Sequence, residues 1–111
     1  MTSSTSPVAS PLFSPLAGDP DLCELVQMYV DEMPDRIAVI AQLLAEGNWE
    51  ELRRAAHQMK GAAGSYGFDA VTPAAGAVED AIRDGAPEEQ IRQAAASLLA
   101  VCSRVRAGVG E

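Results

Sequence analysis

Apolar residues recur every three or four positions along this chain from about residue 19 onward, which is the spacing of one face of an α-helix. Glycines at Gly47, Gly67 and Gly85 divide this pattern into segments. No segment alternates apolar and polar residues as a strand does. The pattern therefore predicts an all-α fold. Short connections make neighbouring helices antiparallel, so we expect an up-down four-helix bundle.

Each predicted helix carries one apolar stripe that should face the core. In chain order the stripes are Leu22, Val26, Tyr29, Met33, Ile37, Ile40 and Leu44; Leu52, Ala56, Met59, Ala63 and Tyr66; Val71, Ala75, Val78 and Ile82; and Ile91, Ala95, Leu98, Cys102 and Val105. Pro34 interrupts the first stripe. Because proline lacks a backbone N–H, it either kinks this helix or splits it in two.

Polar and glycine residues indicate where the helices begin and end. Asp19 is the expected N-cap of the first helix, and either Asp69 or Thr72 is the expected cap of the third. The second helix should run from about Trp49 to Tyr66, with Gly67 as its C-terminal cap. The last predicted helix opens at Pro87, Glu88 and Glu89 and ends at Gly108 and Gly110.

Residues 1–18 differ from the rest because they are rich in Ser, Thr and Pro. This composition predicts a flexible N-terminal tail, with Leu12, Phe13 and Leu16 available to dock on the body. Residues 19–108 then form the helical bundle. The length of 111 residues fits one domain.

The charge balance excludes several classes of partner. The chain has 16 acidic against 8 basic residues and a formal net charge of -8. Nucleic acids and anionic membranes both require clustered Lys and Arg, so neither is an expected partner. No apolar run could span a bilayer, and no signal peptide is evident, so a cytoplasmic protein is expected. Cys23 and Cys102 lack neighbouring ligands for a metal, and we expect both to be reduced.

His57 is the only histidine, and it does not belong to a core stripe. At roughly 100° per residue from Leu52, His57 falls near 140° on the helical wheel. On the same wheel Arg53 lies at roughly 100°, Lys60 at roughly 80°, Gly61 at roughly 180° and Gly64 at roughly 120°. The wheel predicts an exposed imidazole with basic residues and two glycines around it.

The two glycines favour a functional interpretation of this face. Glycine in a helix interior lowers stability by about 1 kcal/mol relative to alanine, which is a large fraction of the unfolding free energy of a small domain. They could mark an early helix end or a close helix crossing. Alternatively, their missing side chains let another protein reach the imidazole of His57.

The segment His57-Gln58-Met59-Lys60-Gly61-Ala62-Ala63-Gly64-Ser65-Tyr66-Gly67-Phe68 resembles the signature of histidine phosphotransfer domains. Residues 63–68 are especially similar to the phosphotransfer domain of chemotaxis histidine kinases. The resemblance covers about residues 19–107. It implies a phosphocarrier in a two-component phosphorelay, which accepts a phosphoryl group from a receiver-domain aspartate or a kinase and passes it to a response-regulator aspartate.

The resemblance also implies a role for each matching residue. His57 is the acceptor, Lys60 would offset phosphoryl charge, and Gly61 would give the partner clearance. Gly64, Arg53 and Arg54 could take part in docking, as could the rims of Ala56, Ala63 and Tyr66. In chemotaxis kinases a glutamate on the following helix hydrogen-bonds the imidazole, and Glu79 lies at the matching place, although it could instead be a solvated acid paired with Arg83.

The implied partners are response-regulator receiver domains and a sensor histidine kinase. No cofactor is expected in this chain, and Mg²⁺ should come with the receiver. No kinase motif is present, so we expect no ATP-dependent self-phosphorylation. The protein is expected to be a standalone monomer.

Three alternatives remain open. The chain could be a non-catalytic helical adaptor, or a detached N-terminal module of a chemotaxis-type kinase. A hydrolase that uses His57 as a base is disfavoured, because Ser65 is distant along the helix and no oxyanion site is evident.

Overall fold

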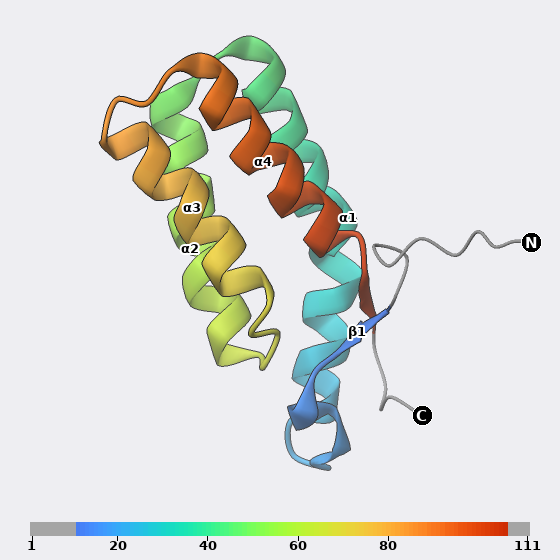
Figure 1. Ribbon diagram of the computed structural model, residues 1–111. Helices are drawn as coiled ribbons and strands as arrows, with labels where there is room; N and C mark the ends of the chain where they lie inside the picture. The colour runs from blue at the N-terminus through green and yellow to red at the C-terminus, as the bar shows by residue number, and fades with distance from the viewer. Residues whose placement is uncertain (1–10, 107–111) are drawn as a thin grey trace, which may run out of the picture.

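The computed structural model describes residues 11–106, and within them four helices pack side by side as a bundle (Figure 1). The helices are α1 (Cys23–Glu46), α2 (Trp49–Ser65), α3 (Val71–Arg83) and α4 (Glu88–Cys102). The predicted all-α bundle is therefore confirmed. No helix within residues 11–106 has both the length and the apolarity needed to cross a bilayer.

The first arm is one continuous helix that runs through Pro34. The alternative of a split at Pro34 is wrong. Met33 is buried on one side of the proline and Ile37 is partly buried beyond it, while Pro34 itself is exposed. Packing of the apolar face on both sides of the proline offsets the backbone hydrogen bond that Pro34 cannot donate.

Most helix ends follow the predicted signals. Gly47 ends α1 in the left-handed conformation, with φ of 68°, and Asn48 caps α2 by accepting from the Glu51 N–H. Gly67 also has a positive φ, one residue beyond the α2 C-cap Tyr66. Positive φ suits glycine because it has no Cβ to clash with the backbone.

Three predicted ends are wrong. The N-cap of α1 is Leu22, because Asp19 accepts from the Asp21 N–H in a turn that precedes the helix. The N-cap of α3 is Ala70, without a side-chain cap, so neither Asp69 nor Thr72 serves there. Helix α4 stops at Cys102, well before Gly108 and Gly110, which lie outside the described residues.

An N-terminal strap, defined here as residues 11–18, lies against the body. It contains the short strand β1 (Leu12–Phe13) and the 3-10 helix η2 (Pro15–Gly18). Strand β1 pairs in parallel with β2 (Val105–Arg106), a strand pair that the periodicity did not predict. Ser14 is buried, and its hydroxyl donates to the Tyr66 carbonyl over 2.5 Å. Residues 11–18 are thus docked elements, and residues 1–10 of the expected tail lie outside the described part of the chain.

The core is built from the predicted stripes. Leu52, Val78 and Leu98 are fully buried, and the ring of Tyr29 stacks on Tyr66 and Phe68. Val105 is buried as predicted, although it belongs to β2 and not to α4. The most extensive helix contact is between α2 and α3, and this pairing brings together the side chains of the candidate site.

Candidate functional site

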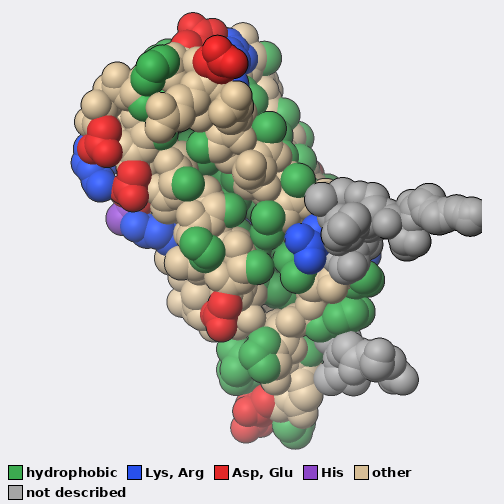
Figure 2. Space-filling view, viewed as in Figure 1, with side chains coloured by type: hydrophobic (Ala, Val, Ile, Leu, Met, Phe, Trp, Pro, Cys, Tyr) green, Lys and Arg blue, Asp and Glu red, His purple; other side chains and the backbone are tan. Residues whose placement is uncertain are grey.

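Helix α2 buries one face and presents His57 on another. The core positions Leu52, Ala56 and Met59 are buried at 0–3% exposure, whereas the His57 side chain is 63% exposed. In the space-filling view the single histidine stands at the edge of the molecule, directly beside basic side chains (Figure 2). The predicted exposure of His57 is therefore confirmed, and it follows from the angular offset between residues 52 and 57.

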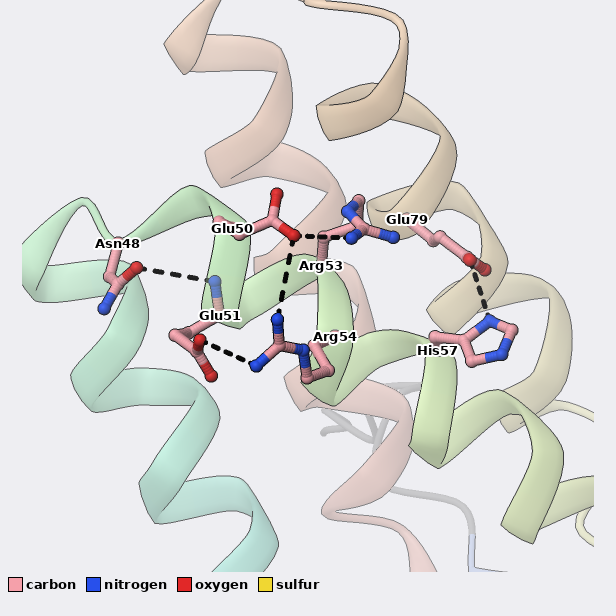
Figure 3. Close-up of polar contacts among 7 residues, drawn as sticks. All are labelled: Asn48, Glu50, Glu51, Arg53, Arg54, His57 and Glu79. Atoms are coloured by element: carbon pink, nitrogen blue, oxygen red, sulfur yellow. Dashed lines mark hydrogen bonds and ion pairs between the residues drawn. The ribbon is translucent and has the colours of Figure 1, made fainter.

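Glu79 reaches the histidine from helix α3. Its side chain is only 6% exposed, and its Oε2 lies 2.8 Å from His57 Nδ1 (Figure 3). This contact is the one that the resemblance to phosphotransfer domains implied for Glu79. The alternative in which Glu79 pairs with Arg83 is wrong, because the Arg83 guanidinium pairs with Asp80 instead.

Lys60 binds the other oxygen of the same carboxylate. Lys60 Nζ lies 2.8 Å from Glu79 Oε1, so Glu79 bridges the imidazole and the ammonium. The hydrogen bond from Lys60 is the main cause that lowers the pKa of Glu79, and the bond to His57 lowers it further against the opposing effect of burial. Glu79 is consequently a carboxylate at neutral pH.

The charge state of Glu79 determines which nitrogen of His57 carries the proton. An ionised carboxylate can only accept hydrogen bonds. His57 Nδ1 must therefore donate its N–H to Glu79 Oε2. In the neutral ring the lone pair is then on Nε2, the nitrogen that does not face Glu79 (Figure 3).

The bridged carboxylate should make stability depend on pH in a defined direction. The pKa of Glu79 in the folded state is below its ordinary value, so its stabilising contribution is complete above the ordinary glutamate pKa. That contribution is lost as the pH falls through the lowered folded-state pKa. We expect the difference in unfolding free energy between wild type and Glu79→Gln to be large at about pH 7 and smaller at about pH 3. Urea denaturation at both pH values measures it, and a difference that grows in acid would contradict the prediction.

The two arginines are on α2 but do not reach the histidine. The Arg53 guanidinium lies 2.5 Å from Glu50, and Arg54 lies 2.9 Å from Glu51. Both arginines pair with acids one turn earlier in the helix, and Arg53 lies between Glu50 and Glu79, with which it interacts electrostatically (Figure 3). Their exposed pairs are weak, so the guanidiniums could exchange partners at little cost.

The glycines differ in what surrounds them. A Cβ built on Gly61 would meet nothing within 4 Å, whereas one on Gly64 would lie 3.7 Å from Thr72 Oγ1. Gly61 thus leaves open space one turn after His57, and Gly64 faces the start of α3. Ala56 and Ala63 are fully buried, so the prediction that their rims are available to a partner is wrong.

Sequence reasoning missed two residues that contact Lys60. The Thr72 hydroxyl donates to the Lys60 carbonyl over 3.4 Å, and Gly76 lies against the Lys60 side chain. With Glu79, these residues are spaced at i, i+4 and i+7 on one face of α3. This spacing was the available signal, but it does not say which residue of α2 lies opposite.

The described residues contain no grouping of three or more His, Cys, Asp or Glu side chains that could hold a metal ion. Cys23, at the start of α1, and Cys102, at the end of α4, are both free thiols. Reduced cysteines were expected here.

A helical bundle that presents one exposed histidine beside an ammonium and a buried carboxylate has the features of a phosphoryl carrier. The family model described as the Hpt domain matches residues 24–108. The chain therefore belongs to the Hpt family, the histidine phosphotransfer domains that act with histidine kinases and receiver domains in phosphorelays. Comparison with curated proteins and with solved structures finds no significant match.

Proposed function

We propose that His57 is the phosphoryl acceptor of this Hpt domain, which receives the group from a receiver-domain aspartate or a kinase and passes it to a response-regulator aspartate. The observation that carries this proposal is the contact between His57 Nδ1 and the buried Glu79 carboxylate, beside an imidazole that is 63% exposed. This contact orients the ring and leaves Nε2 free to attack.

The proposed transfer forms a bond between His57 Nε2 and phosphorus while the bond from phosphorus to the aspartyl oxygen breaks. The aspartate leaves as a carboxylate, and the reverse reaction regenerates the aspartyl phosphate. Such transfers depend on positioning and on charge neutralisation. Lys60 supplies a positive charge from this chain, and we propose that Mg²⁺ held by the receiver supplies the remainder.

Glu79 has two roles in this scheme. It fixes the ring through Nδ1, and its negative charge favours the positive imidazole that exists while Nε2 bonds to phosphorus. Because Glu79 also binds Lys60 Nζ, it places the ammonium on the same side of the bundle as the acceptor. One buried carboxylate thus organises both groups that the phosphoryl group would meet.

A direct test uses two phosphoryl donors. Phosphoramidate phosphorylates reactive imidazoles without a protein partner, and a labelled phosphorylated receiver tests transfer between proteins. We expect both donors to give an acid-labile phosphohistidine on this chain, detected by ³¹P NMR, whereas ATP alone should give none. Absence of phosphohistidine with every donor would overturn the proposal and favour the helical adaptor.

The tautomer of His57 tests the role of Glu79. In the wild type we expect the neutral ring to be mainly the Nδ1–H form, because that nitrogen donates to Glu79. Glu79→Ala removes the acceptor, so the population should shift toward the Nε2–H form that free imidazoles prefer. Long-range ¹H–¹⁵N NMR of the ring resolves the two forms. An unchanged tautomer ratio in Glu79→Ala would contradict the assignment.

Gly61 gives a prediction in which stability and activity change in opposite directions. Because open space surrounds Gly61, Gly61→Leu should fold and should stabilise α2 by about 0.5–1 kcal/mol through helix propensity. The new side chain should nevertheless obstruct the receiver and slow transfer by roughly tenfold or more. Ala96→Leu, at an exposed position of α4, is the control for an added surface leucine. A Gly61→Leu variant with normal transfer from the receiver would exclude the clearance role.

A further inference from the structure

We infer that Gly76 of α3 is a positioning residue, whose small size leaves the space through which the Lys60 side chain passes to the acceptor site. The inference deepens the proposed function and rests on it, because it concerns how the domain places its ammonium beside His57.

Lys60 is contacted by α3 at three points, from its backbone carbonyl to its Nζ. Thr72 Oγ1 donates to the Lys60 carbonyl, a Cβ on Gly76 would lie 3.5 Å from Lys60 Cδ, and Glu79 Oε1 lies 2.8 Å from Nζ. These three residues of α3 lie on one helix face. They therefore define the path of the Lys60 side chain across the α2–α3 contact.

Neither backbone conformation nor a contact with the backbone of another element requires a small residue at position 76. Gly76 has no positive φ, so an L-residue could adopt its conformation. A Cβ at this position would meet no backbone atom of another element within 4 Å, and Lys60 Cδ is the neighbour that it would meet. Glycine also weakens the interior of a helix relative to alanine. The remaining structural reason for a small residue is the space that Lys60 occupies.

A larger side chain at position 76 would compete with Lys60 for that space. The distance of 3.5 Å is an ordinary van der Waals contact, so alanine fits. The two methyl groups of valine extend beyond Cβ into the volume of the Lys60 methylenes. Lys60 is already 36% exposed, so it can turn into solvent, and its ion pair with Glu79 would then be lost.

The test compares four variants: Gly76→Ala, Gly76→Val, Ala77→Val and Lys60→Ala. Ala77 is exposed on α3, so Ala77→Val controls for a β-branched residue in this helix. We expect Gly76→Val to slow transfer from a phosphorylated receiver by roughly tenfold, because it removes a charge-assisted contact. Gly76→Ala and Ala77→Val should stay within about twofold of wild type, as surface substitutions usually do.

A double variant shows whether Gly76 acts through Lys60. If it does, Gly76→Val should have no further effect in a Lys60→Ala background, because both changes remove the same ammonium. Multiplied effects in the double variant would overturn the inference, as would a normal rate in Gly76→Val.

A readout without phosphotransfer separates this inference from the proposed function. Carboxyl ¹³C NMR follows the titration of Glu79, whose other direct partner is His57 and whose more distant charged neighbour is Arg53. In Gly76→Val the pKa of Glu79 should rise to that in Lys60→Ala, while Gly76→Ala keeps the wild-type value. An unchanged Glu79 titration in Gly76→Val would overturn the inference even if His57 is the acceptor. If His57 were not the acceptor, the NMR result would still report the position of Lys60.

Discussion

Replacing His57 by glutamine should abolish formation of phosphohistidine, with a loss of at least about a thousandfold in the rate of labelling from a phosphorylated receiver. The amide of glutamine has a similar shape but no nucleophilic nitrogen. Because the His57 side chain is 63% exposed, the substitution should leave the helical fold intact. Circular dichroism and ³¹P NMR on the same sample check both parts.

The matched control is Gln58→Asn, a change at the neighbouring exposed position that leaves the imidazole in place. It should be labelled at the wild-type rate. Acid-labile label that persists in His57→Gln would refute the assignment of the acceptor, since the chain has no second histidine.

Removing the ammonium at position 60 should produce the second largest effect. A hydrogen bond to a charged group contributes roughly 1.5–3 kcal/mol, and about 1.4 kcal/mol corresponds to a factor of ten in rate. If Lys60 transfers its contact from Glu79 to the phosphoryl oxygens, Lys60→Ala should slow transfer by about 10- to 100-fold. Binding of the unphosphorylated receiver should change little, because the contact is made mainly to the transferred group.

Rapid-quench kinetics with a phosphorylated receiver measure the rate, and titration calorimetry measures receiver binding. Arg36→Ala is the control, because Arg36 is a basic residue of α1, a helix that contributes nothing to the candidate site, and its guanidinium pairs with Glu32. We expect Arg36→Ala to retain most of the activity. Equal rates in Lys60→Ala and wild type would exclude a role for the ammonium.

The arginines illustrate how far a helical wheel can be relied upon. The wheel places Arg53 on the same flank as His57, and this angular position follows from the regular geometry of a helix. The direction of a long side chain does not follow from it. Glu50 and Glu51 lie at i−3 from Arg53 and Arg54, a spacing that the sequence also contains, and both guanidiniums form ion pairs with these acids instead of contacting His57.

The contacts of the N-terminal strap could be predicted from the sequence only in part. The Ser, Thr and Pro content of residues 1–18 predicts flexibility, and the Leu12, Phe13 and Leu16 side chains of the strap suggest docking. Its contacts, however, join residues far apart in the chain: Ser14 binds Tyr66, and Leu12 pairs with Val105. Two-residue strands leave no periodic signal, because a pattern of alternation needs more residues than such a strand contains.

Periodicity determined the buried stripes of the helices and the exposure of His57, because a helix repeats its faces at a constant angle. Tertiary packing decided the rest of the site. The packing of α2 against α3 determined which charged groups are in contact. It placed Glu79 between His57 and Lys60, and it placed Gly76 against the Lys60 side chain. A wheel specifies directions around one axis, whereas distances of 2.8 Å between side chains depend on how two axes are placed relative to each other.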